Sequence, residues 1–156
     1  PPKGIRGVAS LNRATRYGGD FERYFTEAED DLLLIVQIET REAVDNAEAI
    51  ANVDGVNVLF IGPLDLTTSL GIRGELHRPE FISAMEKVAN ASKNAGKAAG
   101  TLLLNPDDVA KAIDIGFSFI AVGSDAGCVV SGMKNNAELL QRLKNKVDAI
   151  PQVRQS

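Results

Sequence analysis

Four short apolar, β-branched runs, each followed by a helical pattern, constrain the fold of this chain more than any other feature. The runs are near-continuous rather than alternating, as in strands of a parallel sheet that is covered on both faces. Strands that alternate with helices also imply right-handed crossovers. The sequence therefore predicts an α/β protein with a parallel sheet, whose strands lie in the ranges 32–38, 57–61, 97–104 and 117–122.

Helix signals fill the gaps between these runs. Thr40 is a suitable N-cap, and Asn105 followed by Pro106 is typical of a helix start. Gly116 stands just beyond the end of that second helix, where a left-handed residue closes many helices. We expect helices over 20–30, 42–52, 79–94, 106–115 and 134–149, the last with an apolar stripe of Leu139, Leu140, Leu143, Val147 and Ile150.

This order of elements fits either an open doubly wound sheet or part of a (β/α)8 barrel. A whole barrel takes about 250 residues, so the 156 residues here hold about half of one. The chain has no initiator Met and opens as if in the middle of a loop, which indicates a fragment. No linker or second domain interrupts it, and we expect residues 1–156 to form a single domain.

Composition excludes several classes of partner. The formal net charge is -4 and the pI is near 5.0, whereas a nucleic-acid-binding domain is usually basic. The basic residues are scattered, and no apolar run approaches the roughly 20 residues that span a bilayer. The single cysteine, Cys128, cannot form an internal disulfide, which favours a reducing, cytoplasmic location. We expect Cys128 to be buried as a small apolar residue rather than to act as a reactive thiol.

Two carboxylates stand where apolar runs stop. Glu39 ends the first run, in Gln37-Ile38-Glu39, and Asp65 follows the second. Side chains alternate across a strand, so Ile35, Gln37 and Glu39 share one face, which becomes polar only at its C-terminal end. Leu34, Val36 and Ile38 form the other face, which we expect to pack under the helices.

The C-terminal ends of parallel strands are where such folds place their sites. Two acids that converge there can bind one hard divalent cation, because hard cations prefer oxygen ligands. A helix-capping or loop-bridging role is the alternative for either acid alone. The pair favours a metal site.

The segment Gly62-Pro63-Leu64-Asp65 has the composition of a tight loop after the second run. Gly62 would let the backbone approach a ligand, and the amides of Leu64 and Asp65 could donate to a bound carboxylate. A second Gly-containing segment, 123–127, is interpreted as the last turn between a strand and a helix. The only histidine, His77, lies in a polar stretch and is expected to be a solvated loop residue.

At these residues the chain resembles the HpcH/HpaI aldolase family, the metal-dependent class II pyruvate aldolases related to citrate lyase β subunits. The resemblance extends over nearly the whole chain, with segments in the family's order and spacing. The matching segments are Pro1-Pro2-Lys3-Gly4-Ile5-Arg6-Gly7-Val8, Asn12-Arg13-Ala14 with Tyr17-Gly18, Gln37-Ile38-Glu39, Val53-Asp54-Gly55-Val56, and Phe60-Ile61-Gly62-Pro63-Leu64-Asp65-Leu66 with Ser69-Leu70-Gly71.

The resemblance implies the fold and the ligands of the site. The chain would be about the last four β/α units of a (β/α)8 TIM barrel, with the N-terminal half absent. Glu39 and Asp65 would bind Mg²⁺ or Mn²⁺, and Gln37 would contact the oxo acid. The backbone amide of Leu64, where the family usually has Ala, would hold the substrate carboxylate beside Gly62 and Asp65.

The resemblance also implies the reaction. A 4-hydroxy-2-oxo acid would be cleaved to pyruvate and an aldehyde, with the metal stabilising the enolate of pyruvate and no Schiff-base lysine. The family's catalytic Arg and His come from its first strands, so no catalytic acid or base is assigned within this chain. Two alternatives stay open: a non-catalytic half-barrel that binds metal or oxo acid or serves in assembly, and a citrate lyase β-like acyl-CoA lyase. The family forms oligomers with exchanged C-terminal helices, and we expect a homo-oligomer here.

Overall fold

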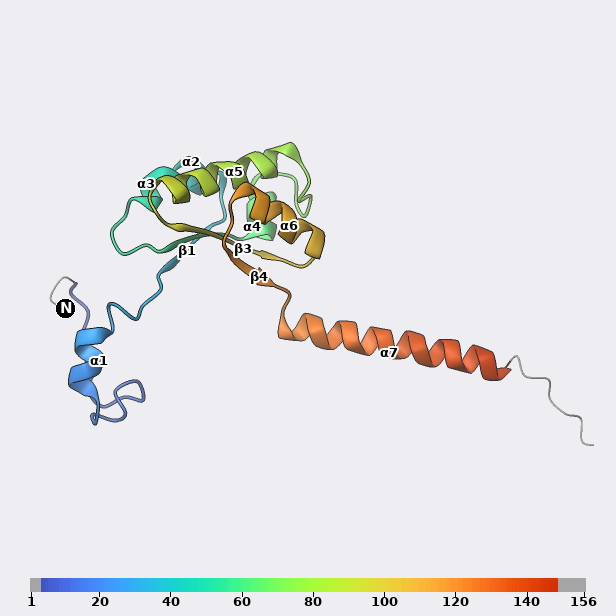
Figure 1. Ribbon diagram of the computed structural model, residues 1–156, viewed down its shortest axis with the longest axis horizontal. Coiled ribbons are helices and arrows are strands. Elements are labelled where there is room, and N and C mark those ends of the chain that lie inside the picture. The colour runs from blue at the N-terminus through green and yellow to red at the C-terminus, as the bar shows by residue number, and fades with distance from the viewer. Residues whose placement is uncertain (1–3, 149–156) are drawn as a thin grey trace, which may run out of the picture.

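The computed structural model describes residues 4–148, which build a four-stranded parallel sheet (Figure 1). The strands lie in sequence order, and their register places Gln37 beside Phe60, Phe60 beside Gly100 and Gly100 beside Phe119. Each observed strand falls within one of the four predicted apolar runs, which confirms the parallel α/β fold. The strands are β1 (Ile35–Ile38), β2 (Val58–Ile61), β3 (Ala98–Leu103) and β4 (Phe119–Val122).

Helices connect the strands and gather over one face of the sheet (Figure 1). The predicted helices 79–94 and 106–115 are confirmed with their bounds. Asn105 caps the start of the second helix and Gly116 ends it, as predicted. Asn105 accepts a hydrogen bond from the amide of Asp107, and Gly116 is left-handed with φ 116°. The helices are α1 (Phe21–Glu27), α2 (Arg41–Asp45), α3 (Ala47–Ala51), α4 (Pro63–Ser69), α5 (Pro79–Asn94), α6 (Pro106–Ile115) and α7 (Asp125–Asp148).

Three helix predictions need correction. The expected helix 42–52 is two helices, because the backbone leaves helical geometry at Asn46 between α2 and α3. The segment that begins at Gly62 is the start of α4 rather than a tight loop, since Pro63 occupies the first turn, where its fixed φ suits a helix. The segment 123–127, expected to be a turn, leads directly into α7, which begins at Asp125 rather than at 134.

The hydrophobic core lies between the sheet and the helices. Ile38, Leu59 and Ile61 are fully buried in the same cluster as Phe81 and Val88 of α5. Val36 packs against this cluster, so the face assigned to Val36 and Ile38 is confirmed. Leu34 instead precedes β1 and is exposed, because the helical layer does not extend over that end of the strand.

The opposite face of the sheet is open, contrary to the expectation that both faces are covered. Ile35 and Phe119 on this face are more than a third exposed. In a closed barrel this inner face would be covered by strands from the other side of the barrel, and these four strands curve around only part of such an interior.

The helices α1 and α7 lie away from the sheet, at opposite ends of the molecule (Figure 1). The described side chains of α7 are exposed, including Leu139, Leu140 and Leu143 of the predicted stripe. The side chain of Val147 and all of Ile150 lie outside the described part of the chain. Cys128 is on α7 and exposed, so its predicted burial is wrong, because nothing in the described chain packs over the first turns of this helix. Between residues 4 and 148, no helix is both long and apolar enough to cross a membrane.

Candidate metal site at the ends of β1 and β2

Glu39 is the residue that directly follows β1, and its side chain lies beside that of Gln37. The Gln37 side-chain amide donates to Glu39 Oε1 over 2.7 Å. Thr40 then caps α2, with its hydroxyl oxygen accepting from the amide of Ala43 at 3.1 Å, as predicted. The hydroxyl of Thr40 therefore caps α2, and the carboxylate of Glu39 does not take part in this cap.

Gly62 provides the surface against which the Glu39 carboxylate rests. A β-carbon at residue 62 would lie 2.6 Å from Glu39 Oε1 and 3.0 Å from its Cγ, which is closer than atoms can approach. The backbone of Gly62 has φ -86°, which any residue can adopt, so a larger residue at this position would displace the Glu39 side chain rather than strain the backbone. We predicted that the missing side chain of Gly62 would let a ligand approach the backbone. In the structure the side chain of Glu39 occupies that space.

Asp65 lies three residues beyond Gly62, in the first turn of α4, and is exposed. Leu64 precedes it and is 54% exposed. The first amides of a helix have no intrahelical acceptor, so the N–H groups of Leu64 and Asp65 are available as donors. The amide of Arg41 donates to Ser69 Oγ at 3.1 Å, which ties α4 to the turn that follows Glu39.

The link between Arg41 and Ser69 could not be found from the sequence. The two residues are 28 positions apart and carry no motif of their own. Only the packing of α4 against the β1–α2 turn brings them together.

The chemistry of the donors fits a hard divalent cation. Within residues 4–148, neither Glu39 nor Asp65 forms an ion pair with a basic side chain. The described part of the chain also holds no group of three or more His, Cys, Asp or Glu side chains arranged for a metal. Mg²⁺ is commonly held by only one or two carboxylates, with water and substrate oxygens completing its shell. Glu39 and Asp65 supply two carboxylates of this kind, from the segments that follow neighbouring strands.

His77 is exposed, as predicted. Its Nδ1 lies 3.6 Å from Asp108 Oδ1 and 3.5 Å from Lys111 Nζ, at the start of α6. These contacts hold a surface loop against α6 and give the histidine no part in the candidate site.

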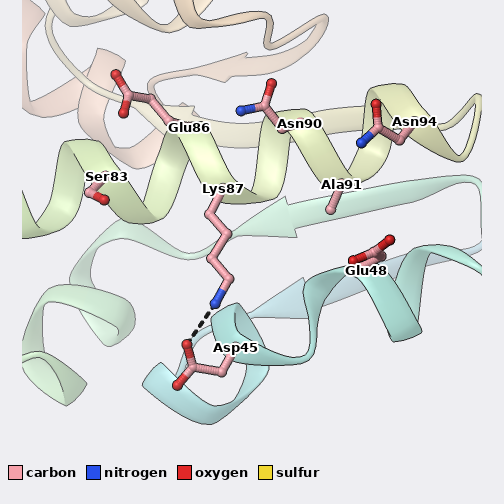
Figure 2. Close-up of a pocket in the computed structure, with 8 residues that line it drawn as sticks. All are labelled: Asp45, Glu48, Ser83, Glu86, Lys87, Asn90, Ala91 and Asn94. Atoms are coloured by element: carbon pink, nitrogen blue, oxygen red, sulfur yellow. Dashed lines mark hydrogen bonds and ion pairs between the residues drawn. The ribbon is translucent and has the colours of Figure 1, made fainter.

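A separate cavity of ≈ 440 Å³ lies in the helical layer, between α5 and the α2–α3 pair (Figure 2). Lys87 Nζ donates to Asp45 Oδ1 at 2.7 Å across it. Among the described residues that line the cavity, Lys87 carries the only basic side chain. The ammonium group of Lys87 lowers the pKa of Asp45. This polar groove lies between helices and not at the strand ends, so we do not assign the metal to it.

Replacing Lys87 with Met is expected to return the pKa of Asp45 toward its ordinary value, because the hydrogen bond and the charge that lower it are both removed. The pair stabilises the fold above the unfolded-state pKa of Asp45, and this contribution is lost as pH falls through the lower folded-state pKa. Urea midpoints of the two proteins should therefore differ slightly at neutral pH and converge in acid. A difference that persists in acid would contradict this account.

The fold and the site together define a class of protein. Four parallel β/α units in sequence order, with polar residues at the C-terminal ends of the strands, are the arrangement of part of a (β/α)8 barrel, a fold whose sites lie on that face.

Comparison with known proteins then identifies the family. The model of the HpcH/HpaI aldolase/citrate lyase family matches residues 1–132, and the chain belongs to this family. It is 46% identical over 134 residues to a pyruvate aldolase from Rhizobium etli, covering 85% of this chain and 52% of that protein. It is 47% identical to a hydroxypyruvate/pyruvate aldolase from Chromohalobacter salexigens, covering 80% and 49%.

A crystal structure of a family protein from Burkholderia cenocepacia J2315 superimposes with a TM-score of 0.83 at 33% identity, over 90% of this chain and 54% of that one. The chain thus spans about half the length of the curated relatives it matches. The family and its named members are aldolases, so the enzyme class of the family is lyase.

Proposed function

We propose that this chain supplies the metal- and oxo-acid-binding half of a divalent-metal-dependent aldolase. The reaction would cleave a 4-hydroxy-2-oxo acid to pyruvate and an aldehyde. The observation that carries the proposal is the Glu39 carboxylate, which rests on Gly62, accepts from Gln37 and has no basic partner in the described chain.

Glu39 and Asp65 would hold Mg²⁺ or Mn²⁺. When bound, this cation would supply Lewis-acid stabilisation of the negative charge that develops on the 2-oxo acid as the carbon–carbon bond breaks. Gln37 positions the Glu39 carboxylate through its amide and would donate its second N–H to the substrate. The free amides at the start of α4, on Leu64 and Asp65, would orient the substrate carboxylate beside Gly62.

Other parts of the proposal rest on the family. The names of the two relatives include pyruvate and hydroxypyruvate, which are 2-oxo acids that can chelate a cation through carboxylate and keto oxygens. The catalytic arginine and histidine would come from outside the 156 residues, so that residues 1–156 are the C-terminal half of an aldolase barrel. Leu64, with an exposed side chain, would narrow the entrance for the aldehyde portion.

The exposed apolar residues of α7 support a homo-oligomer. Val129, Met133 and Leu140 are each at least half exposed and recur at helical spacing, so they form a stripe on one side of the helix. We propose that α7 packs on a neighbouring subunit, where that stripe would be buried.

Two measurements test the proposed function. Calorimetry on the purified chain should detect one Mn²⁺ per chain, and pyruvate should bind more tightly when Mn²⁺ is present. Cleavage of 4-hydroxy-2-oxo acids is then followed by pyruvate release, with Mn²⁺ and with chelator. Because the catalytic arginine and histidine would lie outside these residues, cleavage is measured on the full-length protein, and metal-dependent pyruvate binding without cleavage by that protein would favour the non-catalytic alternative. Failure to bind Mn²⁺ would overturn both.

A further inference from the structure

Helix α4 approaches the turn between β1 and α2 at two points. At the start of the helix, the backbone of Gly62 lies against the Glu39 side chain, where a β-carbon would come within 2.6 Å of Oε1. At its last residue, Ser69 Oγ accepts a hydrogen bond from the amide of Arg41 at 3.1 Å. These two contacts join the segment that carries Asp65 to the segment that carries Glu39, and they define which side of α4 faces the end of β1.

Asp65 lies between these two contacts along the helix. Gly62, Asp65 and Ser69 are spaced at i, i+3 and i+7, which places them on one side of a helix. The side of α4 that carries Asp65 is therefore the side that is bound to the β1–α2 turn.

The bond to Ser69 also satisfies a donor that α2 itself cannot satisfy. Arg41 is the first residue of α2, and the first amides of a helix have no intrahelical acceptor. The hydroxyl of Thr40 already accepts from the amide of Ala43. Ser69 supplies the Arg41 amide with an acceptor from another element, so the start of α2 and the end of α4 are joined.

The other side of α4 is held by Thr67. This residue is fully buried, and its hydroxyl accepts from the amide of Gly74 at 3.0 Å and donates to the carbonyl of Pro63 at 2.7 Å. A helix of seven residues is not stable by itself, so the orientation of α4 is set by contacts with its surroundings. Among these contacts, the bond of Ser69 is directed toward the end of β1.

We propose that Ser69 is a positioning residue of the candidate metal site. Its bond to the Arg41 amide holds Asp65 at a fixed separation from Glu39, so that both carboxylates reach one cation without a prior movement of α4. Ser69 itself supplies no ligand. The inference rests on the proposed function, because it takes Glu39 and Asp65 as the two protein ligands.

The bond and the cation would stabilise the same arrangement of α4 and the β1–α2 turn. Coupling between two such events is reciprocal, so each should strengthen the other by the same factor. A cation bound to Glu39 and Asp65 should therefore slow hydrogen exchange of the Arg41 amide, and loss of the bond should weaken the binding of Mn²⁺. A purely structural role for Ser69 would produce neither effect.

The test is calorimetric titration of Mn²⁺ into the full-length protein and its variants. Ser69→Ala removes the acceptor and should weaken binding by about 2–10-fold, the range that corresponds to one hydrogen bond. Ser69→Thr retains a hydroxyl and should bind Mn²⁺ as the wild type does. Thr68→Ala removes the neighbouring hydroxyl, which donates within α4 to the carbonyl of Leu64 at 2.7 Å, and should leave the affinity unchanged.

A further variant removes the donor instead of the acceptor. Proline has no amide hydrogen and suits the first position of a helix, and Thr40 before it already has the extended backbone that a following proline requires, with φ -129° and ψ 158°. Arg41→Pro should therefore keep α2 and weaken Mn²⁺ binding as Ser69→Ala does, whereas Arg41→Ala retains the amide and should not. The double variant Ser69→Ala/Arg41→Pro should lose no more affinity than either single variant.

Hydrogen exchange gives a readout that does not depend on catalysis. Peptides covering residues 40–46 should exchange faster in Ser69→Ala than in the wild type, and Mn²⁺ should slow this exchange more in the wild type than in the variant.

The outcomes separate this inference from the proposed function. Wild-type Mn²⁺ affinity in Ser69→Ala, or weakening of the same size by Ser69→Ala, Ser69→Thr and Thr68→Ala, would overturn the positioning role of Ser69. The proposed function would still stand in either case if Glu39→Gln abolishes Mn²⁺ binding. A wild-type protein that binds no Mn²⁺ would overturn the proposed function and this inference together.

Discussion

Replacing Glu39 with Gln is expected to abolish measurable Mn²⁺ binding while the fold is retained. The substitution removes the charge of one of the two proposed protein ligands but keeps the shape of the side chain and its neighbour Gln37. Loss of an outer-shell partner alone costs about 10–100-fold in metal affinity, and loss of a ligand should exceed that. In the full-length protein, metal-dependent cleavage should fall on the order of 10³-fold, which corresponds to the several kcal/mol that a Lewis acid contributes.

A matched control separates this effect from a general loss of negative charge. Glu42 is an exposed acid in the first turn of α2, three residues after Glu39 and outside the site. Glu42→Gln should leave the Mn²⁺ titration unchanged. Calorimetry with all three proteins provides the comparison, and equal weakening by both substitutions would refute the assignment of Glu39 as a ligand.

Replacing Gly62 with Ala is expected to weaken Mn²⁺ binding by about 10–100-fold, the effect that loss of a contact to a ligating side chain has on metal affinity. The new β-carbon would lie 2.6 Å from Glu39 Oε1, so the carboxylate must move. The backbone at Gly62 suits alanine, and once the Glu39 side chain has moved aside, a Gly→Ala change adds about 0.4–1 kcal/mol of stability through the unfolded state. Metal binding and stability should therefore respond in different directions.

Two further variants test whether the effect of Gly62→Ala arises from its contact with Glu39. Gly132→Ala introduces a β-carbon into open space on α7 and should leave metal affinity unchanged. Glu39→Asp shortens the side chain and should relieve the contact with Ala at position 62, so the double variant should lose less than the sum of the two single variants. Additive losses would show that the two residues act independently.

Sequence reasoning succeeded where the determining interactions are local. The helix over 79–94 follows from apolar periodicity, and the Asn105 cap and left-handed Gly116 depend on contacts within a few residues. It failed at Asn46 and at the starts of α4 and α7. Pro63 in the first turn of α4 and Asp125 in the first turn of α7 are local helix-start signals that the loop and turn predictions left out. The exposure of Cys128 depends instead on tertiary packing, since no helix or sheet in the described chain covers that turn of α7.

The sequence by itself determined that Gln37 and Glu39 stand at the end of one strand and Asp65 beyond the next, and that the C-terminal ends of these strands share one edge of a parallel sheet. Hydrophobic periodicity is sufficient for this, because alternation and strand direction are properties of each segment. Only the tertiary structure decided that the Glu39 carboxylate rests on Gly62 and that Phe60 meets Phe119 on an open face. These contacts join residues from different strands, and their distances depend on the register and curvature of the assembled sheet.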